Sequence, residues 1–218
     1  MNKRSIREAL WAKLSPLAKE GFRLKRNAMV RSLTPGTTEK VFCDVLDYRP
    51  KYILEPALAV RIDKVEEIFH RTSVYEKKYH SETPTISFAF GHVNPDLDLF
   101  RYDVTDAYSL ESALNNILRD FQTYALPFLQ ANTSIEALDR LLNDAPKEDC
   151  SYCRMEDLRC SHGLIVAKLT KRSNYDELKE TYFTRLRSFA DGFYLPSFER
   201  LAVDLDSRAA AKDTGTQC

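Results

Sequence analysis

Apolar residues recur at two different spacings along this chain, and the change between them predicts where strands give way to helices. Between residues 109 and 143 they recur at steps of three and four, which places them on one face of a helix. The members of this stripe are Leu110, Leu114, Ile117, Leu118, Phe121 and Tyr124. Pro127 has no backbone donor and crowds the turn before it, so the helix is predicted to end or kink near Ala125. A second helix is predicted from Thr133 as N-cap, with Glu136 completing a capping box.

Upstream of this stretch, apolar and polar residues alternate, which is the pattern of strands with one buried face. A leading helix over residues 5–20 is predicted to end at Gly21. Five strands are then predicted, at residues 22–31, 41–45, 52–62, 86–90 and 100–104. The alternation in the first of them slips near Arg26–Asn27. Pro56 indicates that the third strand lies at a sheet edge or contains a bulge. Asp63 with Glu66 three residues later predicts a capped helix directly after that strand.

The links between the predicted strands are short, as at the turn over residues 34–37. Parallel neighbours would need a crossover of about a dozen residues or more, so the strands are expected to be antiparallel. The sequence therefore predicts an α+β protein, with an antiparallel sheet of about five strands packed on helices and a helical C-terminal subdomain. The predicted divisions are an α+β domain over residues 1–145, a helical part over 146–206 and a flexible tail over 207–218.

Composition and charge narrow the class of protein. Lys and Arg together number 32, as do Asp and Glu, so no net charge draws the whole molecule toward nucleic acid or a membrane. The charge-free run over residues 122–135 is shorter than the ~20 residues that cross a bilayer. The first residues lack the apolar core of a signal peptide, so the five cysteines are not expected to form a disulfide framework. The sequence predicts a cytoplasmic protein with no membrane partner.

The N-terminal two thirds resemble a known group of proteins. The matching features are a helix ending in a Gly-Phe pair at residues 21–22, a basic strand that reaches Arg31, a hairpin, and a later helix leading into ALPFL at 125–129 and SIEAL at 134–138. Over about residues 6–142 this arrangement resembles small uncharacterised bacterial proteins classed as a domain of unknown function. The resemblance implies a partner-binding or immunity role, because some relatives are encoded near toxin genes. It brings no catalytic residues.

The C-terminal third lies outside that resemblance and holds residue types that bind metals. Cys150, Cys153, Cys160 and His162 fall within thirteen positions, in DCSYCRMEDLRCSH. The first two form the C-x2-C half of a zinc knuckle, and the four together would supply the tetrahedral ligands of one structural zinc. The C-x-H half is tighter than in familiar zinc sites. The alternative is that these cysteines are free thiols between helices and that the protein holds no cofactor.

A second candidate site is electrostatic. The first 31 residues carry nine Lys and Arg against two Glu, a local charge of +7 in a chain of zero net charge. Strand alternation directs Arg23 and Lys25 into solvent and Leu24 between them into the core. The expected partner-binding basic face consists of Arg23, Lys25, Arg26 and Arg31. The alternative is a solvated surface, neutralised by acids packed nearby, such as Asp96, Asp98, Asp103 and Asp106.

Catalytic chemistry finds little support in the sequence. The histidines outside the cysteine cluster are scattered, no Ser lies in a G-x-S-x-G motif, and the six glycines form no phosphate-binding loop. The sequence therefore favours a non-enzymatic cytosolic protein that binds a protein partner with an acidic surface, in an immunity-like or regulatory role. The alternative is a nucleic-acid-associated or zinc-binding regulatory factor, and an enzyme of unknown class comes third.

Overall fold

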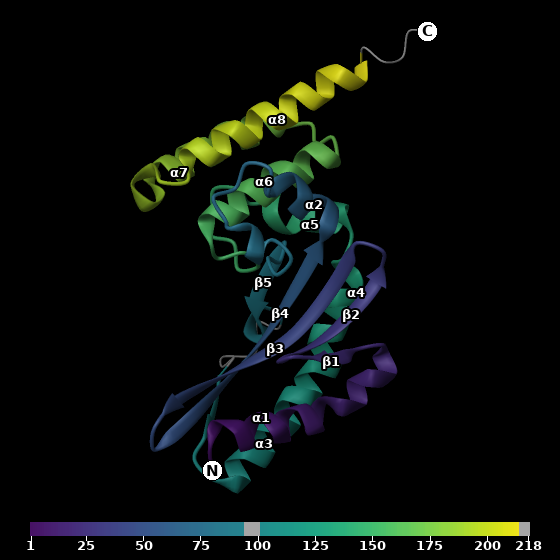
Figure 1. The fold of residues 1–218 in the computed structure, drawn as a ribbon, viewed down its shortest axis with the longest axis vertical. Helices are drawn as coiled ribbons and strands as arrows, with labels where there is room; N and C mark the ends of the chain where they lie inside the picture. Colours follow the sequence, from purple (N-terminus) through teal and green to yellow (C-terminus); the bar gives the residue numbers. More distant parts are fainter. Residues whose placement is uncertain (94–100, 214–218) are drawn as a thin grey trace. The chain divides into compact units, whose positions relative to one another are not determined.

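The computed structural model describes residues 1–93 and 101–213, with side chains up to Ser207. It confirms the α+β class. In this part of the chain six strands form one antiparallel sheet. Five of them follow the order β1-β2-β3-β4-β5 (Figure 1), and β6 pairs with β4. The strands are β1 (Arg23–Lys25), β2 (Ala28–Thr34), β3 (Thr37–Tyr48), β4 (Lys51–Ile62), β5 (Ile86–Ala89) and β6 (Tyr102–Val104).

The first three strands are joined by tight turns with local causes. The stretch predicted as one strand over residues 22–31 is two strands, because Arg26 adopts a left-handed conformation with φ of 53° and turns the chain between β1 and β2. Gly36, with φ of 90°, closes the predicted turn between β2 and β3. The alternation in β3 is also confirmed, since its inward residues Val41, Cys43 and Val45 are buried.

Helices make up most of the rest. They are α1 (Lys3–Leu14), α2 (Asp63–Phe69), α3 (Ala107–Asp120), α4 (Leu126–Ala131), α5 (Ile135–Asn143), α6 (Glu156–Leu169), α7 (Tyr175–Ser188) and α8 (Leu195–Asp213). Single 3-10 turns occur at η1 (Ser15–Glu20), η2 (Lys77–Tyr79), η3 (Phe90–His92) and η5 (Phe189–Gly192).

The leading helix matches its prediction closely. Pro16 lies where α1 tightens into the 3-10 turn η1, and Gly21 ends that turn with φ of 85°, a conformation that glycine adopts without a steric penalty. The predicted stripe faces the core, and its members Ile6, Leu10, Leu14 and Leu17 are all buried. The N-terminal helix is therefore fixed by the same spacing that predicted it.

The central helix changes its winding where the sequence predicts a break. A π-helical turn, η4 (Phe121–Ala125), separates α3 from α4. Pro127 lies in the first turn of α4, where a missing backbone N–H is tolerated, and the wider π turn accommodates the irregularity before it. The stripe residue Phe121 is fully buried and packs edge-on against Phe22, with ring centroids 5.6 Å apart.

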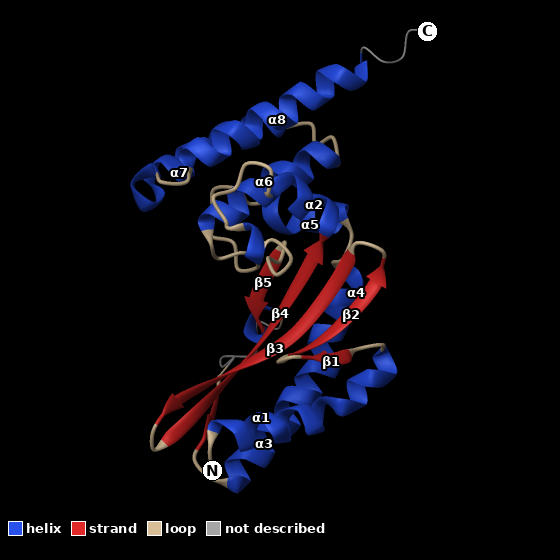
Figure 2. Cartoon of the chain, viewed as in Figure 1, coloured by secondary structure: helices blue, strands red, loops and turns tan. Residues whose placement is uncertain are grey.

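The chain divides into two compact units. Unit 1 is Met1–Val60 with Ser87–Asn132, and unit 2 is Arg61–Ile86 with Thr133–Cys218. Unit 1 contains most of the sheet, with α1 packed against α3 (Figure 2). Unit 2 contains α2 and the helices from α5 onward, which pack around the largely buried α6. The predicted boundary near residue 145 divides the chain differently, because residues 61–86 belong with the later helices.

Some local expectations differ from the structure. β4 lies between β3 and β5, so Pro56 does not mark a sheet edge, and the ladder with β6 covers only residues 52–54 and ends before it. The N-cap of α5 is Ser134, one residue after the predicted cap, and its hydroxyl accepts from a backbone N–H three residues on. α8 continues to Asp213, into the predicted tail. Phe100, expected in the last strand, lies outside the described residues.

Candidate functional site

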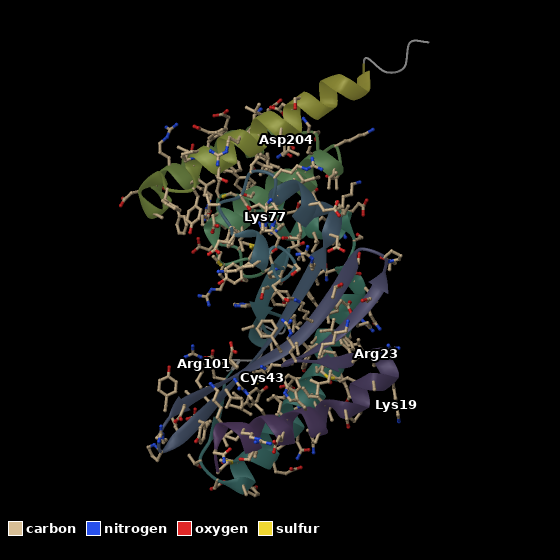
Figure 3. All side chains as sticks on the ribbon, viewed as in Figure 1. Lys19, Arg23, Cys43, Lys77, Arg101 and Asp204 are labelled. Carbon is tan, nitrogen blue, oxygen red and sulfur yellow. The ribbon has the colours of Figure 1, made fainter. Side chains whose placement is uncertain are left out.

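The predicted basic face lies on unit 1, where β1 forms one edge of the sheet. β1 pairs with β2 on one side only, and all three of its residues are exposed. The exposed Lys19 of η1 lies at the same end of unit 1 as Arg23 (Figure 3). Within the described chain, Lys19, Arg23 and Lys25 form no ion pair. We call the exposed cations Lys19, Arg23, Lys25 and Arg26 the basic edge.

Leu24 does not enter the core as the alternation predicts. Its side chain is 51% exposed. It stands opposite Met29 in the ladder between β1 and β2, so the two side chains share one face of the sheet. Met29 is buried because strands flank it on both sides, whereas none of the described strands lies on the outer side of Leu24. The core face of the sheet therefore ends in a half-exposed leucine between two cations.

Arg31 does not belong to the basic edge, which corrects the prediction. Its Nε donates to Oε2 of Glu39 at 2.5 Å, and its Nη1 donates to the carbonyl of Glu20 at 3.0 Å. The guanidinium also lies 4.6 Å from the centre of the Phe22 ring, within the range of a cation–π contact. Because Glu39 is fully buried, this ion pair is internal. Arg31 fastens the end of η1 to β2 and so holds β1 in place.

The acids that were expected to neutralise the basic face have other partners where they are described. Asp103 accepts from Nζ of Lys51 at 2.6 Å. Asp106 caps α3 by accepting the backbone N–H of Ser109 at 2.7 Å, and this hydrogen bond lowers the pKa of Asp106. The other two, Asp96 and Asp98, lie outside the described residues. The described acids of this set therefore leave Lys19, Arg23 and Lys25 without an ion pair.

The four predicted zinc ligands lie in unit 2, and the structure does not gather them around one point. Across the described residues, no three His, Cys, Asp or Glu side chains are arranged to hold a metal ion. Burial raises the pKa of the Cys153 and Cys160 thiols, so both are protonated at neutral pH, whereas zinc binds thiolates. Each thiol faces its own acceptor: Cys150 the Leu141 carbonyl at 3.7 Å, Cys153 the Met155 carbonyl at 3.9 Å and Cys160 the Glu156 carboxylate at 3.5 Å.

His162, the fourth predicted ligand, is fully buried in α6. Its Nδ1 donates to the carbonyl of Thr85 at 2.9 Å. Its Nε2 lies 3.3 Å from Oε1 of Glu66, in a direction that gives no well-aligned hydrogen bond. Both ring nitrogens thus face groups other than the cysteines. The geometry gives the zinc hypothesis no support.

Two arginines hold the segment over residues 145–149, which leads to Cys150. Arg159 is 1% exposed and donates to two carbonyls of this segment at 2.6 and 2.8 Å, and Arg185 donates to a third at 2.7 Å. The acceptors are the carbonyls of Glu148, Ala145 and Lys147, in that order. Charge-assisted hydrogen bonds of this kind are among the stronger ones in proteins. The arginines therefore order a connection that a metal was expected to order.

A buried polar network surrounds Glu66, and the sequence did not reveal it. The predicted capping box of α2 is wrong, since this helix has no side-chain cap and Glu66 is fully buried. The hydroxyls of Thr83 and Thr85 each donate to one of its carboxylate oxygens at 2.7 Å. The spacing of Glu66 and His70 by four residues on α2 is a local signal, but nothing local indicates the threonines. The Glu66 network consists of Glu66, His70, Thr83, Thr85 and His162.

His70 is held in one tautomer at the margin of this network. The hydrogen of the Thr83 hydroxyl is given to Glu66, so Nε2 of His70, 2.7 Å from that hydroxyl, must donate to it. Nδ1 then accepts from the hydroxyl of Ser73 at 3.0 Å. The ring stacks on His80 with centroids 3.8 Å apart. Burial, and then the neighbouring His80, lower the pKa of His70 to about 4, so the ring is neutral at pH 7.

The Glu66 network has the character of a polar core. A general acid or base has to come within hydrogen-bond reach of a bound substrate, and Glu66 and His162 are 0% exposed. Apart from Nε2 of His162, the buried polar groups of this network have hydrogen-bond partners, and such groups instead specify a single packing arrangement. We therefore assign this network a structural part in unit 2, and the basic edge remains as the candidate functional site.

The chain matches no protein-family model, no curated protein and no solved structure. The resemblance to small bacterial proteins therefore stays a prediction. No helix in the described ranges has both the length and the apolar character needed to cross a membrane.

Proposed function

We propose that this protein is a non-enzymatic cytosolic protein that binds an acidic protein partner through its basic edge. The observation that carries the proposal is a set of four exposed cations around β1, which pairs with β2 alone among the described strands. An immunity-like or regulatory role is consistent with an exposed basic edge and with a Glu66 network whose carboxylate is buried. The cysteines Cys43, Cys150, Cys153 and Cys160 are free thiols, which favours a reducing compartment.

The arrangement of charge favours binding over stability. Exposed cations contribute little to folding, because water already solvates them. Lys19, Arg23 and Lys25 form no ion pair with a described residue, so their charges create a local positive potential in a molecule of zero net charge. Such a potential attracts a complementary surface and repels cationic ones, chiefly by changing the association rate. The basic edge is thus suited to selecting a partner by charge.

Nucleic acid is the other class of partner that cations attract. Sites for single strands combine cations with aromatic side chains on which bases stack. Here the residue between Arg23 and Lys25 is Leu24. The aromatic residue nearest in sequence, Phe22, is buried. A leucine flanked by cations suits a protein surface of mixed apolar and acidic character. We therefore propose a protein partner.

A pull-down from the source cell tests this proposal with three forms of the chain. The first is the wild type, the second is Arg23→Glu with Lys25→Glu, and the third is a control, Lys64→Glu with Lys77→Glu, which makes the same charge change at exposed positions of unit 2. We expect an acidic protein that the wild type and the control retain, that the first double variant loses, and that rising salt releases.

Identical proteins retained by all three forms would contradict the proposal. A gel shift on duplex and single-stranded DNA runs in parallel with the same forms. A DNA complex that depends on Arg23 and Lys25, with no acidic protein retained, would assign the basic edge to nucleic acid instead.

A further inference from the structure

We infer that the basic edge takes an extended acidic segment of the partner as an additional strand beside β1. This inference rests on the proposed function and adds to it the form of the ligand. In an antiparallel ladder, backbone groups of alternate residues point to opposite sides of a strand. β1 has a paired side toward β2 and a side without a strand. Its outward N–H and C=O groups are therefore available for main-chain pairing.

Leu24 indicates which face the added strand would extend. It shares a face with the buried Met29 and is left 51% exposed where the sheet ends. A strand laid beside β1 would place an apolar side chain next to Leu24 and continue the core face by one position. The opposite face carries Arg23 and Lys25, so acidic side chains of the same strand would lie opposite these cations. An alternation of apolar and acidic residues meets both requirements.

Contacts of Phe22 and Arg31 order the chain next to β1 in the absence of a partner. Phe22, directly before β1, is buried against Phe121 and lies under the guanidinium of Arg31. Arg31 is fixed in turn by the buried carboxylate of Glu39. A strand that is already ordered loses little conformational entropy on binding. This compensates for the small number of main-chain hydrogen bonds that a three-residue strand can offer.

Charge would also oppose pairing of this edge with a second copy of itself. Exposed strand edges invite association with any extended chain, and cations placed on them prevent it by repulsion. The same cations attract a strand that carries carboxylates. The basic edge therefore discriminates between two kinds of strand that make the same backbone hydrogen bonds.

A peptide of alternating Glu and Val, about ten residues long and labelled with fluorescein, is a probe for this mode of binding. Two further versions are N-methylated, one at every Glu and the other at every Val, which removes the donors of one peptide edge or the other without changing charge. We expect fluorescence anisotropy to show binding of the parent peptide and a loss of at least about tenfold for one of the methylated versions. Equal affinity for all three, or no binding of the parent, would overturn the inference.

Variants of the chain separate this inference from the proposed function. Leu24→Ser should weaken peptide binding, whereas Leu33→Ser, at a leucine of β2 that is also partly exposed but lies outside the ladder with β1, should not. If Arg23→Glu with Lys25→Glu abolishes binding while methylation and Leu24→Ser have no effect, charge alone binds the partner and the strand mode is wrong. If the charge reversal has no effect either, the proposed function fails as well.

Discussion

Glu66 in unit 2 and Arg23 in unit 1 are both charged residues, but their surroundings are opposite. Glu66 is fully buried, and each of its carboxylate oxygens accepts a threonine hydroxyl. Arg23 is exposed at a sheet edge and forms no ion pair with a described residue. Burying a charge is costly unless partners satisfy it, whereas an exposed charge costs nothing and remains available. Charges that specify the fold are thus buried and hydrogen-bonded, whereas charges that can recognise a partner stay exposed.

The same contrast occurs within unit 1 itself. Arg31 and Arg23 belong to one basic stretch of sequence, and both were expected in the basic face. Arg31 faces inward to the buried Glu39, whereas Arg23 faces solvent. Sequence charge alone could not distinguish them, because the acid that pairs with Arg31 comes from the neighbouring strand. Within one unit, the two arginines therefore allow a buried, paired charge to be compared with an exposed one.

The largest expected change in folding stability comes from removing the buried carboxylate of Glu66. Glu66→Ala removes the acceptor of the Thr85 hydroxyl, leaves the Thr83 hydroxyl only the His80 carbonyl at 3.2 Å, and takes the carboxylate away from His162. We expect a loss of about 3–5 kcal/mol in the free energy of unfolding, measured by urea denaturation. The control Glu67→Ala changes an exposed neighbour on the same helix and should alter stability by only about 0.5 kcal/mol. Equal losses in the two variants would show that the Glu66 network is not structural.

The two arginines of unit 1 should differ in the same way, with a somewhat smaller effect. Arg31→Ala leaves the buried carboxylate of Glu39 unpaired, so we expect unfolding to become easier by about 2–4 kcal/mol. Arg23→Ala removes only an exposed side chain and should change stability by about 0.5 kcal/mol or less. Thermal melting of the two variants compares them directly. If the melting temperature fell as far for Arg23→Ala as for Arg31→Ala, the two arginines would contribute equally to stability, and the structural role would not be particular to Arg31.

Lowering the pH is expected to reduce the folding stability gradually. The unfolded chain protonates His70 near its ordinary pKa of 6.5, whereas burial keeps the pKa of the folded state at about 4. The unfolded state therefore binds more protons between these values, so stability from this group is full above pH 6.5 and is lost as the pH falls toward 4. Urea midpoints measured across this range should fall less steeply for His70→Gln than for the wild type. Parallel curves would mean that His70 does not contribute.

Periodicity predicted most of the fold, because it is a local property. The stripe that includes Ile6 and Leu10 and the turn closed by Gly36 depend on residues within a few positions of one another. The π turn before Pro127 also follows from a local defect, the missing N–H. Residues 22–31 were predicted as one strand with a slip near Arg26–Asn27, and the slip did not show that two strands form, because a left-handed arginine such as Arg26 is uncommon.

The sites were harder to predict because their partners are distant in sequence. Thr85 and His162 meet Glu66 across 19 and 96 positions, and no spacing rule relates them. A glutamate three residues after an aspartate has the pattern of a helix cap, and only burial shows that Glu66 has another role. Similarly, Cys160 and His162 are close in sequence but lie on a helix, where residues two apart point in different directions. The spacing of the predicted zinc ligands therefore did not show whether their side chains meet at one point, and in the described residues no three of them do.

The smallest expected effect is that of adding or removing zinc on the melting temperature. Zinc would have to displace protons from the buried thiols of Cys153 and Cys160 and turn His162 away from Glu66 and the Thr85 carbonyl, so binding would oppose the packing of unit 2. We expect neither EDTA nor added zinc to change the melting temperature, and metal analysis of protein purified without a histidine tag to find far less than one equivalent. Zinc bound at one equivalent, with a melting temperature that rises on its addition and no longer does so in Cys150→Ser, would restore the zinc site. It would also show that unit 2 rearranges around the metal, because the present positions of these side chains leave no common point for it.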